Sequence, residues 1–207
     1  KLSKEITVAA KLGSKDANMN PRLRSAIQAA RSANMPKDNI ERAINKSEIN
    51  LNESYENLRY EGFGPYNVAF VIETLTNNKN RTASSIRTIL QKNGGRLGEN
   101  GSTTHFFFSC GVMHVSKKSF SDEKILEIAI NAGAKDCFSK INFHEILSNK
   151  EDFYKVKSQV EKKVNNFSYS GIEWRPYNYL DIPKEQIKKI EEIVESLDNN
   201  DDVQNVF

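Results

Sequence analysis

The sequence contains little cysteine and no long apolar run, and both absences exclude classes of protein. Cys110 and Cys137 are the only cysteines among 207 residues, too few for a disulfide framework, which favours a reducing compartment. No run of about 18 apolar residues occurs, so no membrane-spanning helix is predicted. No secretory leader is visible at the start of the chain, although a removed leader would leave no trace. The length allows one or two typical domains, or three small ones.

Acidic residues are missing from one stretch of the chain, although 28% of all residues are charged. Residues 74–98 contain no Asp or Glu and five cations, namely Lys79, Arg81, Arg87, Lys92 and Arg96. Clustered Lys and Arg displace the counterions condensed on phosphates, so this stretch predicts a polyanionic partner. A solvated helix face with no partner is the alternative interpretation.

The net charge of +3 conceals a strong asymmetry along the chain. Residues 1–50 carry ten Lys or Arg against five Asp or Glu, whereas residues 181–207 carry three against eight. The sequence therefore has a basic front and an acidic tail. This distribution again favours a polyanion as the partner of the front half.

Residues 1–47 show the periodicity of three short helices. Leu2 and Ile6 begin the first apolar face, and Gly13 follows as a stop signal. Asn20 before Pro21 predicts the start of the second helix, and Pro36 opens the third. Helices this short are unstable alone, so we expect them to pack into a small bundle.

Residues 48–60 are polar and predict a linker with a boundary near residue 57. Val68 to Leu75 is then expected to form a buried strand, and Asn80 to Asn93 a helix that ends at Gly94 and Gly95. The outer face of that helix carries small hydroxyls between its cations, a pattern that suits phosphate contact. Residues 102–109 predict a second strand, and a third begins at Gly111.

A βαββαβ pattern can be laid out over residues 111–179, and residues 184–207 supply a further helix and strand. The α/β unit before residue 110 lacks such a second half, so we infer a split domain with an insertion. The predicted fold class is α+β with three domains: a small N-terminal helical bundle followed by two ferredoxin-like α/β sandwich domains, one inserted in the other. The expected limits are residues 1–57 for the helical domain with its linker, 58–110 plus 178–207 for the first α/β domain, and 111–177 for the insertion.

The sequence offers no convincing catalytic site, metal site or cofactor site. The glycines between Gly94 and Gly101 lie between a helix and a strand, whereas nucleotide loops lie between a strand and the next helix. His105, His114 and His144 occur in strand-like sequence without the spacing of metal ligands. The acidic pairs Glu191-Glu192 and Asp201-Asp202 are expected on a solvated helix face and in a turn. We therefore predict a non-enzymatic binding protein without metal or cofactor.

Several aromatic residues have two open interpretations. Their rings either stack on nucleic-acid bases or fill the two α/β cores. Three consecutive phenylalanines must place at least one ring on the outer side of a strand. The residues concerned are Phe63, Tyr66, Phe106, Phe107, Phe108 and Trp174.

Three stretches together resemble the YebC/PmpR family, which includes the mitochondrial translational activator of cytochrome oxidase subunit one. The first is residues 20–44 (NPRLRSAIQAARSANMPKDNIERAI). The second runs from residues 60–65 (YEGFGP) through 76–82 (TNNKNRT) to 94–98 (GGRLG), and the third is residues 201–207 (DDVQNVF). Tyr66-Asn67 departs from the family pattern, which has glycines after Gly-Pro. The family's usual basic start is expected to precede the segment that begins at Lys1.

The resemblance implies a three-domain, non-enzymatic regulator of gene expression in which two α/β domains flank a cleft. Members are commonly classed as DNA-binding transcriptional regulators, while others act on translation and help the ribosome through proline-rich stretches. The implied partner is DNA or rRNA, with the ribosome as an alternative, and the chain is expected to act as a monomer. The implied location is the cytoplasm, or the mitochondrial matrix in a eukaryote.

Phosphate contacts are predicted for ten cations of the helical domain and the first α/β domain. No predicted helix carries the residues that read a specific DNA site, which favours RNA or the ribosome. A protein-interaction scaffold and an enzyme with an unrecognised cleft site are the alternative hypotheses. The ten residues are Arg22, Arg24, Arg31, Lys37, Arg42, Lys79, Arg81, Arg87, Lys92 and Arg96.

Overall fold

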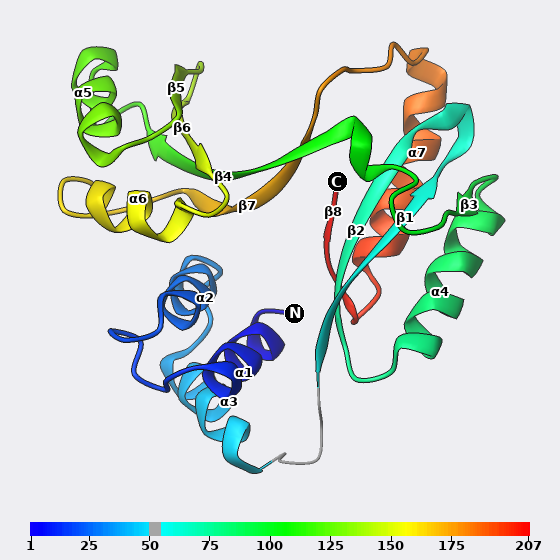
Figure 1. The fold of residues 1–207 in the computed structure, drawn as a ribbon, viewed down its shortest axis with the longest axis horizontal. Helices are drawn as coiled ribbons and strands as arrows, with labels where there is room; N and C mark the ends of the chain where they lie inside the picture. The colour runs from blue at the N-terminus through cyan, green and yellow to red at the C-terminus, as the bar shows by residue number, and fades with distance from the viewer. Residues whose placement is uncertain (50–54) are drawn as a thin grey trace. The chain divides into compact units, whose positions relative to one another are not determined.

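The computed structural model describes residues 1–49 and 55–207, with the side chains of residues 48 and 49 left out. These residues form two compact units (Figure 1). The first comprises Lys1–Ala26, Pro36–Phe108 and Pro176–Phe207, and the second comprises Ile27–Met35 and Ser109–Arg175. No helix in the described part of the chain is long and apolar enough to cross a membrane.

The N-terminal region forms the three expected helices. Asn20 caps the second one, because its Oδ1 accepts a hydrogen bond from the backbone N–H of Leu23 at 3.1 Å. The Asn20 amide also donates to the carbonyl of Ala9 at 2.8 Å and so ties this cap to the first helix. Ile6 and Leu23 are fully buried. The helices are α1 (Leu2–Leu12), α2 (Pro21–Ser32) and α3 (Lys37–Ile49).

The first sheet has the strand order β3-β1-β2-β8, and its paired strands are all antiparallel. Two helices pack against one of its faces, where Ile86 and Leu90 meet Phe70, Ile193 and Leu197. The strands are β1 (Glu56–Phe63), β2 (Ala69–Thr76), β3 (Arg96–Leu97) and β8 (Val203–Val206). The helices are α4 (Lys79–Lys92) and α7 (Lys184–Asp198), and a short 3-10 turn, η1 (Pro65–Asn67), connects β1 to β2.

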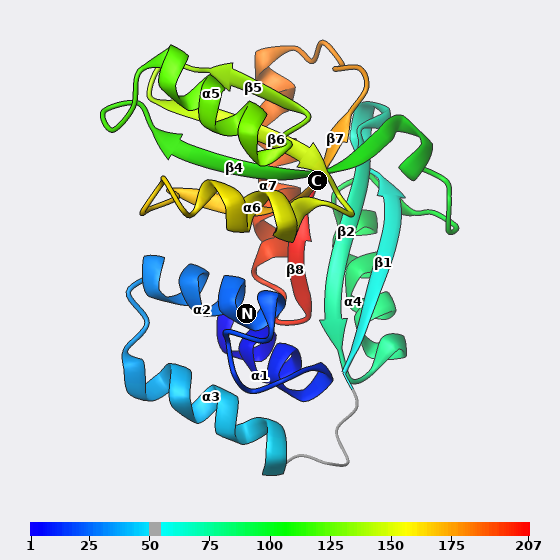
Figure 2. The same cartoon turned by 60° about the vertical axis from the view of Figure 1, so that its left-hand side comes forward.

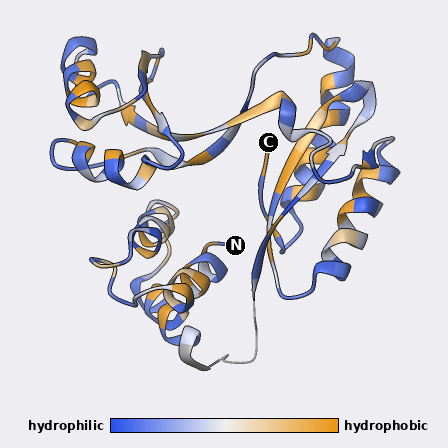
Figure 3. Ribbon diagram, in the orientation of Figure 1, coloured by the Kyte–Doolittle hydropathy of each residue, from blue (hydrophilic) through white to orange (hydrophobic). Residues whose placement is uncertain are grey.

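Two elements of the first α/β region differ from the prediction. Residues 56–60, predicted as linker, begin strand β1, whereas residues 50–54 of that linker lie outside the described residues. β1 is mostly hydrophilic while β2 is hydrophobic (Figure 3), so periodicity alone did not reveal it. The strand predicted over residues 102–109 is also wrong, because that stretch holds a 3-10 turn, η2 (Thr104–Phe106), and the start of β4.

The second sheet has the strand order β5-β6-β4-β7 and a βαββαβ sequence of elements, as predicted. Both of its helices pack on one face (Figure 2), where Phe153 and Ile125 meet Met113, Val115 and Ile146. Gly111 makes this packing possible, because a Cβ at that position would lie 2.5 Å from the Phe153 ring. The elements are β4 (Phe107–Ser116), α5 (Asp122–Ala132), β5 (Asp136–Ser139), β6 (Phe143–Asn149), α6 (Phe153–Val160) and β7 (Tyr169–Pro176).

The predicted fold class is confirmed. N-terminal helices precede two α/β sandwiches, and the second sandwich is inserted between β3 and α7 of the first. The residue limits given above for three domains stay a prediction.

The turn between β1 and β2 holds two non-glycine residues in the left-handed backbone conformation. Tyr66 has φ 62° and Asn67 has φ 59°. Asparagine tolerates this region, whereas for tyrosine the Cβ crowds the following carbonyl. The Tyr66 ring is 48% exposed, so little packing offsets the strain.

We expect Tyr66→Gly to raise the free energy of unfolding by about 0.5–1 kcal/mol. The relief of about 1–2 kcal/mol of left-handed strain exceeds the entropy that glycine adds to the unfolded chain. Urea denaturation followed by circular dichroism measures the change. Asn67→Gly is the matched control and should gain less. No gain in Tyr66→Gly, or a larger gain at Asn67, would contradict the assignment of strain.

Candidate nucleic-acid interface

Helix α4 carries exposed cations outside its buried stripe. Asn78 caps the helix by accepting a hydrogen bond from the backbone N–H of Arg81 at 3.0 Å. Ile86 and Leu90 are fully buried, as predicted. Arg87 and Lys92 are exposed, and neither has an ion-pair partner within the residues that the structure describes. Their charges are therefore available to an external anion.

Arg81, a predicted phosphate contact, is instead bound to a carboxylate of its own unit. Its Nη2 lies 2.7 Å and its Nε 3.3 Å from Oδ2 of Asp202. Asp202 was expected in a solvated turn, but it is only 5% exposed. The same carboxylate accepts hydrogen bonds from Thr82 Oγ1 at 2.8 Å and from Lys4 Nζ at 3.0 Å. The Arg81 charge therefore stabilises the fold and is less available to bind phosphate.

The surroundings of Asp202 keep it ionised. Burial alone would raise its pKa, but the hydrogen bonds from Arg81, Thr82 and Lys4 hold the pKa below its usual range. A buried carboxylate with three donors is stable only while all of them remain in place. The cluster is therefore a structural feature of the first unit.

A groove of about 710 Å³ lies beside this cluster in the first unit. Five cations line it against two carboxylates, Asp201 and Asp202. Of these cations, only Arg81 was predicted from the sequence as a phosphate contact. Lys1, the N-cap of α1, shares one side of the helix with Lys4 and Lys11 at i, i+3 and i+10 spacing, and this spacing was the signal that could have found them. The cations of the groove are Lys1, Lys4, Lys11, Lys46 and Arg81.

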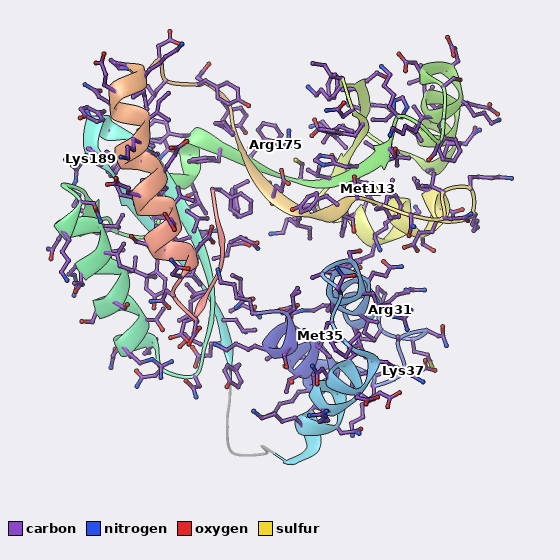
Figure 4. All side chains as sticks on the ribbon, turned by 180° about the vertical axis from the view of Figure 1, so that it is seen from behind. Arg31, Met35, Lys37, Met113, Arg175 and Lys189 are labelled. Carbon is purple, nitrogen blue, oxygen red and sulfur yellow. The ribbon has the colours of Figure 1, made fainter. Side chains whose placement is uncertain are left out.

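The predicted cations of the N-terminal helices have different environments. Arg22 is bound to Glu5 through two contacts of 2.7 and 3.1 Å, so its charge is also used internally. Lys37 is exposed and lies 3.5 Å from Glu41 on the next turn. Arg24 is half-buried and Arg42 exposed. Arg31, which extends from α2 (Figure 4), is exposed and belongs to the second unit, whereas the other nine predicted cations belong to the first.

Two further predicted cations lie near the ends of α4. Lys79 is exposed at its first turn. Arg96 is exposed on β3, and its guanidinium carbon lies 4.7 Å from the centroid of the Phe63 ring. Together with Arg87 and Lys92 they define the α4 face, by which we mean the exposed cations on and next to this helix that no carboxylate of the described residues binds.

The loop after β3 looks like an anion site, but a side chain of the protein already fills it. Glu61 on β1 is 1% exposed and accepts backbone N–H bonds from Gly101, Thr103 and Thr104 at 3.0, 2.7 and 3.0 Å. Arg59 Nε also lies 3.3 Å from this carboxylate. The amides are therefore satisfied internally, which agrees with the rejection of a nucleotide loop.

The pKa of Glu61 follows from this environment. Burial alone would raise it, but the hydrogen bonds from Thr103, Gly101 and Thr104, together with the charge of Arg59, lower the pKa to about 2. The sequence gives little sign of this interaction, because Glu61 lies about forty residues from the loop that it binds.

The histidines and cysteines do not form a metal site. The described residues contain no group of three or more His, Cys, Asp or Glu side chains that could hold an ion. His144 is buried between Ser139 Oγ and the carbonyl of Phe120, both at 2.9 Å. Both ring nitrogens of His144 therefore have partners within the fold.

Comparisons with known proteins agree over the whole chain. Residues 1–49 match the TACO1/YebC protein N-terminal domain, and residues 55–207 match the TACO1/YebC second and third domain. A probable transcriptional regulatory protein of Pelagibacter ubique is 56% identical, covering 100% of this chain and 86% of its own. One of Zymomonas mobilis is 46% identical over 100% of this chain and 83% of its own. The crystal structure of a conserved hypothetical protein from Aquifex aeolicus has 39% identity and a TM-score of 0.87, covering 100% of this chain and 86% of its own.

We expect Glu61→Gln to lower the free energy of unfolding by about 3 kcal/mol at neutral pH. That value corresponds to a pKa displaced from 4.5 to about 2 by the folded state. Because the folded-state pKa is depressed, this stability is present above pH 4.5 and lost as the pH falls toward 2. Urea titrations of the wild type and of Glu61→Gln at neutral pH and at about pH 3 measure the difference in their free energies of unfolding. This difference should be smaller at the acidic pH. A difference that is independent of pH would contradict the role assigned to the carboxylate charge.

Proposed function

The chain belongs to the TACO1/YebC family, and on that premise we propose that it is a nucleic-acid-binding regulator of gene expression that carries out no catalysis. Its relatives in Pelagibacter and Zymomonas are named probable transcriptional regulatory proteins. The observation that carries the proposal is the α4 face, where Lys79, Arg87, Lys92 and Arg96 are exposed within a stretch that has no acidic residue. Such cations bind phosphates by releasing condensed counterions.

Contacts of this kind position a protein on nucleic acid without reading its sequence. The exposed face of α3 argues against a helix that enters the major groove. Asp38 and Glu41 are exposed there beside Lys37 and Arg42, so the face carries both signs of charge. This observation favours the second candidate, an rRNA- or ribosome-associated translation factor, over a sequence-specific DNA-binding protein.

The titratable groups support a binding role rather than catalysis. Glu61, Glu145 and Asp202 are buried, and hydrogen bonds hold the pKa of each below its usual range. A general acid at neutral pH needs the opposite displacement. Burial raises the thiol pKa of Cys110 and of Cys137, which disfavours a nucleophilic thiolate.

Crosslinking in cells, followed by sequencing of both bound DNA and bound RNA, tests which nucleic acid is the partner. Enrichment of ribosomal RNA without promoter DNA would establish the translational function. Enrichment of specific promoter DNA would establish the transcriptional one. Recovery of neither nucleic acid, with a protein partner that survives nuclease treatment, would contradict the proposal in favour of a scaffold.

We expect Arg87→Gln and Lys92→Gln each to weaken nucleic-acid binding without a change in stability. Loss of one phosphate contact should reduce the slope of log K against log salt by about 0.9 for duplex DNA and about 0.7 for a single strand. Fluorescence anisotropy over a series of salt concentrations measures the slope, and urea denaturation measures the stability.

Arg22→Gln is the matched control, because Arg22 is bound to Glu5. It should lower the free energy of unfolding by up to about 1 kcal/mol and leave the salt slope unchanged. If Arg22→Gln reduces the slope while the two α4 variants do not, the α4 face is not the binding surface.

A further inference from the structure

The second sheet has one face without helices, and each of its four strands contributes an aromatic ring to that face. Met113, Val115 and Ile146 point toward α5 and α6. Side chains alternate along a strand, and His114 pairs with Glu145, which pairs with Phe138 on its other side. The aromatic row is Phe138 on β5, Phe143 on β6, His114 on β4 and Tyr169 on β7.

Three rings of the aromatic row lie close together, and the rings of Phe138 and Tyr169 are exposed. The centroid of the His114 ring lies 4.2 Å from that of Phe143 and 5.2 Å from that of Tyr169. Phe138 is 41% exposed and Tyr169 is 39% exposed. Rings on adjacent strands of a sheet provide surfaces on which successive bases can stack.

Hydrogen bonds hold His114 in place and bind the acids nearby. Its Nε2 lies 3.0 Å from Oε2 of Glu145, which is 5% exposed. Arg175 on β7 (Figure 4) donates to both oxygens of Glu145, at 3.3 and 2.7 Å, and to Glu173 at 2.9 Å. One guanidinium thus binds both Glu145 and Glu173, and Asp136 lies farther along β5, opposite Leu147. Because the Arg175 charge offsets only one of the two carboxylates, we expect the phosphate backbone to lie away from Arg175, near Lys140.

Two lysines lie at one end of the aromatic row. Lys140 Nζ lies 5.4 Å from the centroid of the Phe138 ring, and Lys117 Nζ donates to the carbonyl of Lys140 at 3.3 Å. A shallow hollow of about 730 Å³ opens here and is lined by Lys117, Lys140, Ser139, Asn142, Ile141 and Phe143. No carboxylate is among these lining residues, but Lys117 Nζ also lies 3.4 Å from Oδ1 of Asp122. Lys140 is therefore the cation next to the exposed Phe138 ring that has no carboxylate partner in the described part of the chain.

We propose that the helix-free face of the second sheet binds single-stranded RNA, with bases stacked on Phe138, Tyr169 and the Phe143–His114 pair and with phosphates near Lys140. The proposal rests on the proposed function and names the class of nucleic acid and the surface that takes it. A four-stranded βαββαβ sheet with exposed rings is a geometry on which unpaired bases stack. Duplexes are disfavoured as partners of this face because their bases are already stacked.

The test uses the full chain and an oligouridine RNA of about ten nucleotides that carries one 2-aminopurine. The variants are Phe138→Ala and Tyr169→Ala, whose exposed rings can be removed without opening a core. Leu126→Ala is the control, since Leu126 is 46% exposed on α5, the helix that covers the opposite face of the sheet. Each ring variant should weaken binding about 5- to 10-fold or more. The salt slope should stay unchanged, while the quenching of 2-aminopurine by stacking is lost.

The outcomes separate this proposal from the proposed function. If salt-dependent RNA binding survives both ring variants at the wild-type affinity, the stacking surface is wrong and the α4 face is sufficient. The stacking surface is also wrong if Leu126→Ala weakens RNA binding as much as the ring variants do. It is wrong as well if the ring variants lose a protein partner but still bind RNA. If the wild-type chain binds neither this RNA nor duplex DNA at low salt, both proposals fail.

Discussion

The carboxylate of Asp202 is the interaction on which the first unit depends. It binds Lys4 of α1 and both Arg81 and Thr82 of α4, and the carbonyl of the same residue accepts the Leu75 N–H at 2.8 Å. Segments up to 198 residues apart in sequence are thereby joined. Each cation that binds this carboxylate is less available to an external anion, so the fold itself limits which charges can reach a phosphate.

Ion pairs divide the cations of the chain into two groups. Arg22 and Arg81 belong to the fold through Glu5 and Asp202, whereas Arg87 and Lys92 are exposed and have no ion-pair partner in the described part of the chain. Two buried acidic residues are likewise bound within the fold. Glu61 accepts hydrogen bonds from the backbone amides of the loop after β3, and Glu145 is bound by Arg175 and His114. The groups left without such partners include cations on and next to α4 and aromatic rings on the second sheet.

Local signals predicted most of the elements, because helix caps and apolar periodicity act over a few residues. The Asn20 cap, the buried face of α4 and the βαββαβ order of the second sheet all follow from such signals. Strand β1 was missed because its sequence is hydrophilic, and it is held by pairing with β2 and β3 on both sides. The site was harder to predict. A sequence shows how many cations are present, but the partner of Arg81 lies 121 residues away, and the aromatic row needs the register of four strands.

Ultraviolet crosslinking of the purified chain to single-stranded RNA, with mass spectrometry of the crosslinked peptides, tests the central claim most directly. The claim is that nucleic acid contacts the groups that the fold leaves unpaired. The account predicts crosslinks in the peptides that carry Arg87 and Lys92 and in those that carry Phe138 and Phe143. Crosslinks confined to the peptides of Arg22, Arg81 or the acidic helix α7 would contradict it.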